Sequence, residues 1–159
     1  MRQKQANARH CFVCGVDNQF GLQLKFYDTA PGRVEADWMV SEQFQGFPGI
    51  AHGGILASVL DEATTRTVLG ANGSRRIVVT ASLEIRYRKP VPLNTPLKVI
   101  GELIEDKGEI IHATSKIENE QGQVLASARA LLMEAPAELA GKLELDPENW
   151  KVYADGDGG

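Results

Sequence analysis

Long apolar runs are missing from this sequence of 159 residues. Its uninterrupted apolar stretches are only a few residues long, and the first ten residues, from Met1 to His10, are polar and basic. A membrane-spanning helix needs about 20 mostly apolar residues in succession, and a secretory signal needs an apolar segment near its start. We therefore expect one globular domain with its own core, no membrane partner and a cytoplasmic location.

A strong charge of one sign is missing as well. The formal net charge is -4, but seven acidic residues follow Met133 against two lysines there, so that residues 1–133 are close to neutral. A protein that binds nucleic acid needs a basic face to hold phosphates. We expect no nucleic-acid partner, although a few local cations would suffice for one phosphorylated small molecule.

The motifs of several enzyme classes are absent too. The sequence contains no G-x-S-x-G segment, which disfavours a hydrolase with a Ser-His-Asp triad. It contains neither a P-loop nor a G-x-G-x-x-G fingerprint, so that no nucleotide-binding fold is indicated.

Only two cysteines occur, Cys11 and Cys14, too few for a disulfide framework. Their C-x-x-C spacing suits a shared metal or a redox pair, and His10 could add a third ligand. A complete zinc site needs four ligands, the sequence has no further cysteine, and His112 falls in a predicted strand. We favour a turn with two semi-buried thiols in a reducing compartment over a metal shared between two chains, and predict no metal and no cofactor.

The pattern of apolar residues predicts an α+β domain. Between residues 52 and 70, apolar side chains recur at the spacing of one helical face, and Gly70 and Asn72-Gly73 are expected to close this helix. The flanking segments show strand patterns separated by short turns, so we expect an antiparallel sheet of about six strands wrapped around one long central helix. The predicted strands cover residues 22–27, 33–40, 77–88, 97–105, 109–118 and 124–133.

Three regions follow from this pattern. Residues 1–21 form an N-terminal arm with the C-x-x-C-G segment, residues 22–133 form the domain, and residues 134–159 form an acidic tail that we expect to be partly disordered. The strand after the helix alternates with a period of two, which predicts one buried and one polar face. Thr80 belongs to the polar set, and the set expected to be buried comprises Val79, Ala81, Leu83, Ile85 and Tyr87.

The predicted helix begins with His52, Gly53 and Gly54. Glycine amides at a helix N-terminus leave donors open where the helix dipole adds positive charge, a combination suited to a polarised carbonyl oxygen. A tight entry turn without any function is an equally simple reason for the two glycines.

An aspartate, Asp61, stands in the middle of this apolar helix, where aspartate has a poor helix propensity. It could be exposed to solvent, or paired with Arg66 or Arg75, or held there for chemistry. Glu62 projects about 100° away along the helix and is expected to be the surface carboxylate.

The spacing of these residues predicts the assembly. Gly53 and Asp61 are eight residues apart, a rise of about 12 Å along one helix. No single carbonyl group can touch both. If both act on one carbonyl, they come from two chains, which implies a homodimer or a dimer of dimers with active sites at the dimer interface.

The segment His52-Gly53-Gly54 followed by Asp61-Glu62-Ala63, together with the later run TASLEIRYRKPV, resembles the signature of PaaI-type hotdog-fold thioesterases over roughly residues 11–133. The resemblance implies a hotdog fold and the hydrolysis of an acyl-coenzyme A (acyl-CoA) thioester. It implies Asp61 as general base or nucleophile and the Gly53 amide as the group that polarises the carbonyl. It further implies that Thr80 positions the attacking water and that His52 orients the loop.

Other candidates lie around this signature. Gly54, Gln45, Phe47 and Arg88 are predicted to bind substrate, although Phe47 could simply anchor its loop and Arg88 could belong to a solvated strand face. The family often carries an asparagine six residues before the histidine as a second carbonyl donor, where this chain has Gly46. Gln45 could supply the amide instead.

Two other functions fit the same residues. A non-catalytic module that binds acyl-CoA or an aromatic acid would use the same groove. A hotdog hydratase or dehydratase would pair a histidine with an acid, a pairing that His52 and Asp61 could imitate.

Overall fold

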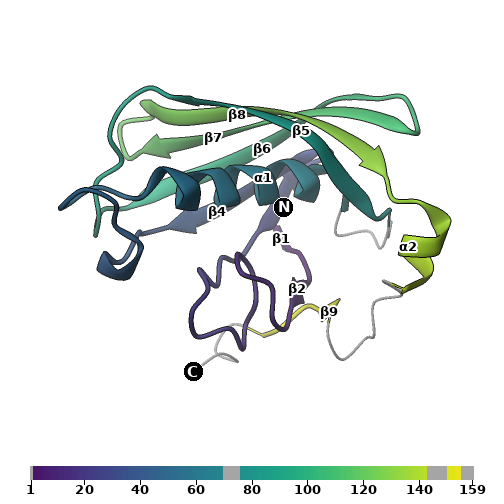
Figure 1. The fold of residues 1–159 in the computed structure, drawn as a ribbon, viewed down its shortest axis with the longest axis horizontal. Coiled ribbons are helices and arrows are strands. Elements are labelled where there is room, and N and C mark those ends of the chain that lie inside the picture. Colours follow the sequence, from purple (N-terminus) through teal and green to yellow (C-terminus); the bar gives the residue numbers. More distant parts are fainter. Residues whose placement is uncertain (1, 70–75, 143–149, 155–159) are drawn as a thin grey trace.

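The computed structural model of this chain describes residues 2–69, 76–142 and 150–154. An antiparallel sheet of seven strands wraps around one long helix, α1 (Gly53–Leu69), which confirms the predicted α+β hotdog fold (Figure 1). The strand order is β1-β3-β4-β6-β7-β8-β5. The strands are β1 (Gln3–Lys4), β3 (Tyr27–Ala30), β4 (Arg33–Trp38), β5 (Val78–Tyr87), β6 (Leu97–Asp106), β7 (Ile110–Asn119) and β8 (Val124–Glu134).

The first predicted strand is wrong. Residues 22–26 do not join the sheet, and β3 begins only at Tyr27. Leu24 is nevertheless buried, and its N–H donates to the carbonyl of Val13 at 2.8 Å, as the N–H of Leu22 does to Phe12. The alternating pattern of this segment is therefore real, but its hydrogen-bond partner is the N-terminal arm and not a strand of the sheet.

Helix α1 lies in close contact with the middle of the sheet. A Cβ atom at Gly101 of β6 would lie 2.2 Å from the Ala63 carbonyl oxygen, so only a glycine allows the helix this close approach. On β7, the Ser115 hydroxyl donates to the Leu60 carbonyl oxygen at 2.8 Å. These two contacts determine how far α1 lies from the sheet and how it is rotated about its axis next to Asp61. The predicted closing turn of the helix lies outside the described residues.

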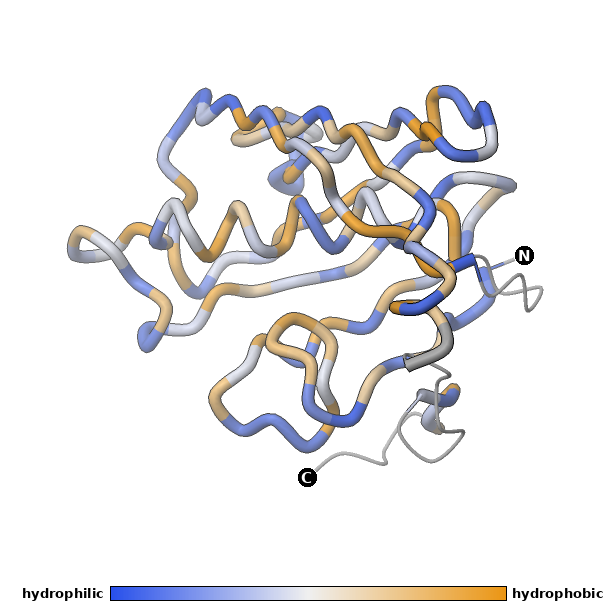
Figure 2. Tube along the Cα trace, turned by 45° about the vertical axis from the view of Figure 1, so that its right-hand side comes forward, coloured by the Kyte–Doolittle hydropathy of each residue, from blue (hydrophilic) through white to orange (hydrophobic). Residues whose placement is uncertain are grey.

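The core fills the space between the helix and the sheet. Polar and apolar residues alternate along the strands, and the apolar ones pack against α1 (Figure 2). Fully buried members of this cluster include Leu60 on the helix, Val99 on β6 and Ile117 on β7. The burial of these side chains orients α1 with one flank toward β5.

Strand β5 forms one edge of the sheet and pairs with β8. Its register shifts between Thr80, which pairs with Leu132, and Ser82, which pairs with Leu131, so that Ala81 is an extra, bulged residue. Because Leu132 is fully buried, Thr80 faces the helix and not the polar side. The predicted alternation is wrong here: Ala81 is exposed.

The arm and the tail meet beside the helix. Strand β2 (Asn7–Ala8) pairs with β9 (Trp150–Lys151), and α2 (Ala137–Lys142) follows β8. In Figure 1 the arm and β9 lie below α1, whereas β7 and β8 lie above it. The other parts of the acidic tail, residues 143–149 and 155–159, lie outside the described residues. Within the described residues, no helix combines the length and the apolar character that a membrane crossing requires.

Candidate active site

His52 precedes α1 and caps its first turn. Its Nδ1 accepts a hydrogen bond from the Gly54 N–H at 2.9 Å, and its carbonyl oxygen accepts from the N–H of Ile55 and of Leu56. The Gly53 N–H differs, because the hydrogen bonds of the described residues include no acceptor for it. Since the helix dipole adds positive charge at this end, the Gly53 amide is available to a carbonyl oxygen.

A depression of about 350 Å³ opens beside this helix end. Gly53, Phe47 and Arg88 all line it, so the structure brings together three residues that were predicted from separate segments. Tyr87 also lines it, and its hydroxyl donates to the Gly53 carbonyl oxygen at 2.9 Å. Sequence reasoning missed Tyr87, because the period-two pattern assigned it to the buried face, whereas its side chain is exposed. The charged residues next to Tyr87, Arg86 and Arg88, were the signal in the sequence that its side chain could be exposed.

The loop before α1 contains the remaining candidate. Gln45 follows the short helix η1 (Glu42–Phe44), and its Oε1 accepts from the Gly49 N–H at 3.4 Å. It is exposed and does not line the depression. At Gly46, a Cβ atom would lie 3.2 Å from the His52 Cα, a contact tighter than usual. The loop thus packs closely on His52 at the position where an asparagine was expected.

Asp61 and Thr80 meet on the flank of α1 that faces β5. The Thr80 hydroxyl donates to Asp61 Oδ1 at 2.7 Å, and both residues are half-buried. The described residues offer Asp61 no ion pair, since Arg66 pairs with Glu62 at 2.9 Å and Arg75 lies outside the described residues. A carboxylate with one oriented oxygen and no bound cation can accept a proton from water.

Glu62 is not the surface carboxylate that was predicted. Its side chain is 19% exposed and pairs with Arg66, whose side chain is fully buried. The guanidinium of Arg66 is held by the Ala6 carbonyl and by Gln5, two residues of the arm. The arm covers this flank of the helix, which the sequence pattern alone did not indicate.

The two cysteines are free thiols close to Glu62. A hydrogen bond from Cys14 lowers the pKa of Cys11 to about 6, against the effect of burial. The same hydrogen bond, together with burial, raises the pKa of Cys14, while the charge of Arg66 acts in the opposite direction.

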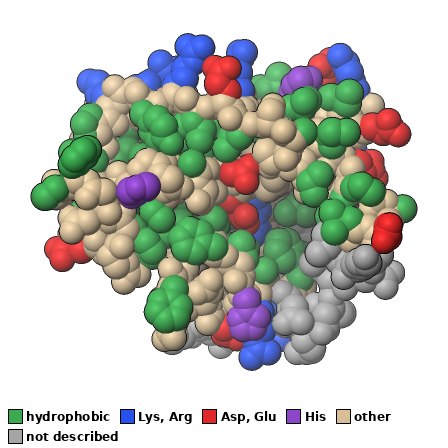
Figure 3. All heavy atoms as spheres, in the orientation of Figure 1, with side chains coloured by type: hydrophobic (Ala, Val, Ile, Leu, Met, Phe, Trp, Pro, Cys, Tyr) green, Lys and Arg blue, Asp and Glu red, His purple; other side chains and the backbone are tan. Residues whose placement is uncertain are grey.

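Within one chain, the predicted residues form two groups. Gly53 and its neighbours lie at the start of α1, and Asp61 with Thr80 lies further along it. Because α1 is continuous from Gly53 to Leu69, the two groups are separated by the rise of two helical turns, about 12 Å. In the space-filling view, acidic side chains reach the surface over the middle of α1, among apolar ones (Figure 3).

Comparison with known proteins places this geometry in a family. Residues 48–126, which include the start of α1, Asp61 and Thr80, match the family model described as the thioesterase superfamily. This part of the chain, and the fold around it, match the thioesterase superfamily. The resemblance noted in the segments around His52, Asp61 and Thr80 is thereby confirmed.

The relatives found by sequence are distant, but their similarity extends over most of this chain. The acyl-coenzyme A thioesterase THEM4 of Rattus norvegicus is 25% identical over 148 residues, which cover 92% of this chain and 59% of that protein. The protein of the same name from Bos taurus is 29% identical over 149 residues, covering 93% and 56%. The chain therefore spans a little over half the length of these relatives.

Solved structures of the superfamily share the fold. A crystal structure described as a thioesterase superfamily protein superposes with a TM-score of 0.69 at 31% identity, covering 79% of this chain and 61% of that one. A Streptococcus pneumoniae structure described as a hypothetical thioesterase protein with coenzyme A gives a TM-score of 0.63 at 22% identity, covering 70% and 85%. At the lower identity the likeness concerns the fold alone.

Proposed function

We propose that this chain hydrolyses an acyl-CoA thioester to a carboxylic acid and coenzyme A. The observation that carries the proposal is the Asp61 carboxylate, which is oriented by the Thr80 hydroxyl at 2.7 Å and forms no ion pair among the described residues. The names of the rat and cattle relatives, acyl-coenzyme A thioesterase, support the substrate class.

Asp61 acts as the general base or as the nucleophile. As a base, it takes a proton from a water that Thr80 helps to position, while the water oxygen attacks the thioester carbon. The negative charge then collects on the carbonyl oxygen, which accepts a hydrogen bond from a Gly53 amide. The carbon–sulfur bond breaks, and the coenzyme A thiolate leaves with the proton from Asp61. As a nucleophile, a carboxylate oxygen of Asp61 attacks the thioester carbon, the carbon–sulfur bond breaks and the coenzyme A thiolate leaves; water then opens the resulting anhydride to the carboxylic acid and regenerates Asp61.

The proposed site is built from two chains. Asp61 and Gly53 of one chain are too far apart for one carbonyl, and Asp61 lies beside β5, a strand of ten residues at the edge of the sheet. An edge strand of this length is suited to pair with the same strand of a second chain related by a two-fold axis. We propose a homodimer, or a dimer of dimers, in which Gly53 of one chain faces Asp61 of the other.

The depression beside Gly53 is the proposed substrate entrance. Phe47 is 82% exposed and offers an apolar surface to the acyl group, while Arg88 offers a cation to a phosphate of coenzyme A. Gly54, whose N–H is occupied by His52, contributes through its small size. Gln45 does not line the depression; we propose that it supports the loop before His52, through its contacts with Gly49 and Ala51. Two free thiols suit a reducing compartment, so we propose a cytoplasmic location.

The alternatives are less well supported by the geometry. A binding module gains nothing from an anionic carboxylate beside a thioester. A dehydratase would use the His52 imidazole with Asp61 for proton transfer, but Nδ1 of His52 already accepts a hydrogen bond from the Gly54 N–H.

A panel of acyl-CoAs with a thiol reagent tests the proposal directly. We expect release of free coenzyme A in a catalytic manner from at least one member of the panel. Binding of the whole panel without turnover, measured by calorimetry on the same protein, would instead establish the binding module.

Sedimentation tests the assembly separately. We expect a homodimer or larger species at assay concentrations, with activity that falls as dilution produces monomers. A monomer with full specific activity would refute the two-chain site.

A further inference from the structure

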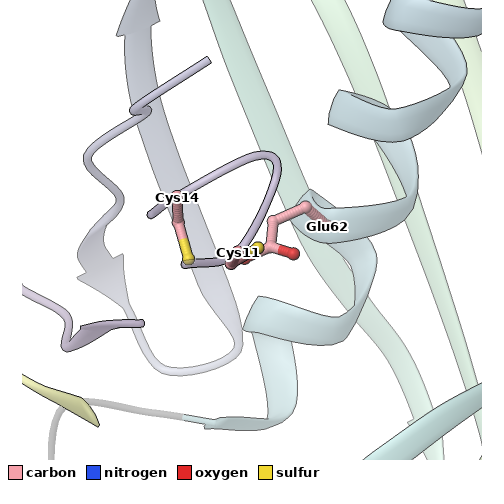
Figure 4. A group of neighbouring side chains, drawn as sticks. All are labelled: Cys11, Cys14 and Glu62. Atoms are coloured by element: carbon pink, nitrogen blue, oxygen red, sulfur yellow. The ribbon is translucent and has the colours of Figure 1, made fainter. Parts of the chain in front are cut away.

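A cluster of three metal-binding groups lies where the N-terminal arm meets α1. Cys11 and Cys14 come from the loop of the arm and Glu62 from the helix, and one ligand atom of each lies within 4.8 Å of the other two. Figure 4 shows the three side chains directed toward one another from these two elements. The proposed hydrolysis assigns no role to any of the three.

The donor set matches a borderline-soft divalent cation. Two thiolates and one carboxylate are ligands that zinc accepts in tetrahedral sites, whereas magnesium and calcium prefer oxygen ligands throughout. Spacing of two residues between Cys11 and Cys14 lets both sulfur atoms bind one ion. His10, which the sequence suggested as a third ligand, does not belong to the cluster; Glu62 takes that place.

The charges around the cluster also fit a divalent cation. Arg66, fully buried, holds Oε1 of Glu62 through its Nε at 2.9 Å, which orients the carboxylate and leaves Oε2 toward other groups. The negative charges of two thiolates and this carboxylate are balanced by a divalent cation and the guanidinium together. Without a cation, two thiolates here would be a large uncompensated charge in a mostly buried site.

Arg66 provides a second, independent observation. Its Nη2 is buried and has no hydrogen-bond partner among the described residues, although Nη1 and Nε are bonded. A buried donor without an acceptor is costly, and thiolates bound to a metal are good acceptors. Arg66 lies close enough to Cys14 for the two side chains to interact electrostatically. Metal binding would thus supply an acceptor near this nitrogen.

The space next to the cluster leaves room for a fourth ligand. A cavity of about 200 Å³ adjoins the cluster and is lined by Cys11, Glu62 and Trp150, among others. Its size admits a water molecule or a small exogenous ligand as the fourth donor. Trp150 belongs to β9 and its ring lies 5.0 Å from the Arg66 guanidinium, so the site lies where the arm, the helix and the tail meet.

We propose that Cys11, Cys14 and Glu62 bind one zinc ion per chain, with a water in the fourth position. The ion fastens the N-terminal arm to α1 at the residue next to Asp61. This site is separate from the proposed thioesterase site, and its detection does not depend on turnover.

Cobalt titration of the full chain tests the site. The protein is reduced with a phosphine, stripped with a chelator and titrated with Co²⁺ alone. We expect a thiolate-to-cobalt charge-transfer band in the near ultraviolet and the intense visible bands of four-coordinate cobalt. Both should saturate at one ion per chain and be lost when Zn²⁺ is added. Absence of the charge-transfer band would overturn the proposal.

Two variants identify the third ligand. Glu62→Gln keeps the size of the side chain and should weaken Co²⁺ binding about tenfold or more, whereas His10→Asn, a matched change of a neighbouring donor outside the cluster, should leave it unchanged. Equal affinities of Glu62→Gln and wild type would refute the assignment of Glu62.

A measurement on wild-type protein covers the case in which Glu62→Gln does not fold. X-ray absorption of the zinc-loaded chain should give a first shell of two sulfur and two lighter ligands. A shell of four sulfur atoms would mean a site shared between two chains, and a shell without sulfur would mean binding elsewhere; either result would overturn the proposal.

Discussion

Replacing Asp61 with asparagine separates a chemical role from a structural one. Asparagine has nearly the shape of aspartate, and its Oδ1 can still accept the hydrogen bond that the Thr80 hydroxyl donates at 2.7 Å. No ion pair of Asp61 among the described residues would be lost. The amide, however, neither accepts a proton at neutral pH nor attacks as an anion, so only the chemistry should suffer.

The expected magnitudes lie far apart. Loss of a positioned general base lowers turnover by about 10² to 10⁴, which corresponds to roughly 3–5 kcal/mol in the activation barrier. Loss of a nucleophile costs at least as much. The free energy of unfolding should change by about 1 kcal/mol or less, because a half-buried carboxylate with one retained hydrogen bond contributes little.

The assay measures release of coenzyme A with a thiol reagent, and the thermal midpoint on the same preparation. Asp37→Asn is the matched control, because it replaces a carboxylate with the same amide at an exposed position on β4. We expect normal turnover of Asp37→Asn. An Asp61→Asn protein that keeps more than about a third of the wild-type rate would refute the role of Asp61, since that loss is far below the effect of a general base.

A single turnover in heavy-oxygen water then distinguishes the two mechanisms. If Asp61 is a base, the label enters the carboxylic acid product in the first turnover. If Asp61 is the nucleophile and water opens the anhydride at the Asp61 carboxyl carbon, the first product carries an oxygen of Asp61 and the label remains in the protein.

Three further changes follow from the same geometry. Thr80→Val keeps the shape and removes the hydroxyl that holds Asp61, so turnover should fall by about tenfold. The thermal midpoint should rise or stay level, because valine favours strands. Unchanged turnover would make Thr80 an ordinary strand residue. Tyr87→Phe removes the hydrogen bond to the Gly53 carbonyl and should lower turnover about two- to tenfold with little change in KM, and a loss confined to KM would contradict this positioning role. Gly101→Ala places a Cβ 2.2 Å from the Ala63 carbonyl and should destabilise the protein by about 1–3 kcal/mol in chemical denaturation; wild-type stability would mean that the helix moves away freely.

Much of the fold could be predicted because it follows from local periodicity. The apolar spacing between residues 52 and 70 predicts a helix, and α1 runs from Gly53 to the last residue described before the gap, Leu69. Five of the six predicted strands match β4, β5, β6, β7 and β8 or begin close to them. The sixth, predicted over residues 22–27, meets β3 only at Tyr27. Local hydrogen bonding and side-chain alternation determine such elements, and a sequence contains both.

The proximity of Asp61 and Thr80 could be expected only from the family resemblance, not from the periodicity. Strict alternation placed Thr80 on the polar face, and a single bulged residue, Ala81, turned it toward the helix. Bulges arise when the curvature of a sheet around its core requires an additional residue, which depends on the partner strand and not on the local sequence.

The amino-acid sequence by itself determined the helix, most strands and the eight-residue spacing of Gly53 and Asp61, on which the proposed two-chain site rests. The tertiary structure alone decided which surfaces cover the helix. The arm buries Arg66 and draws Glu62 to the two cysteines, and it supplies the hydrogen bonds that residues 22–26 were expected to find in the sheet. These contacts join segments far apart in the chain, and their energies depend on burial and on which partner each polar group finds, quantities that no local pattern contains.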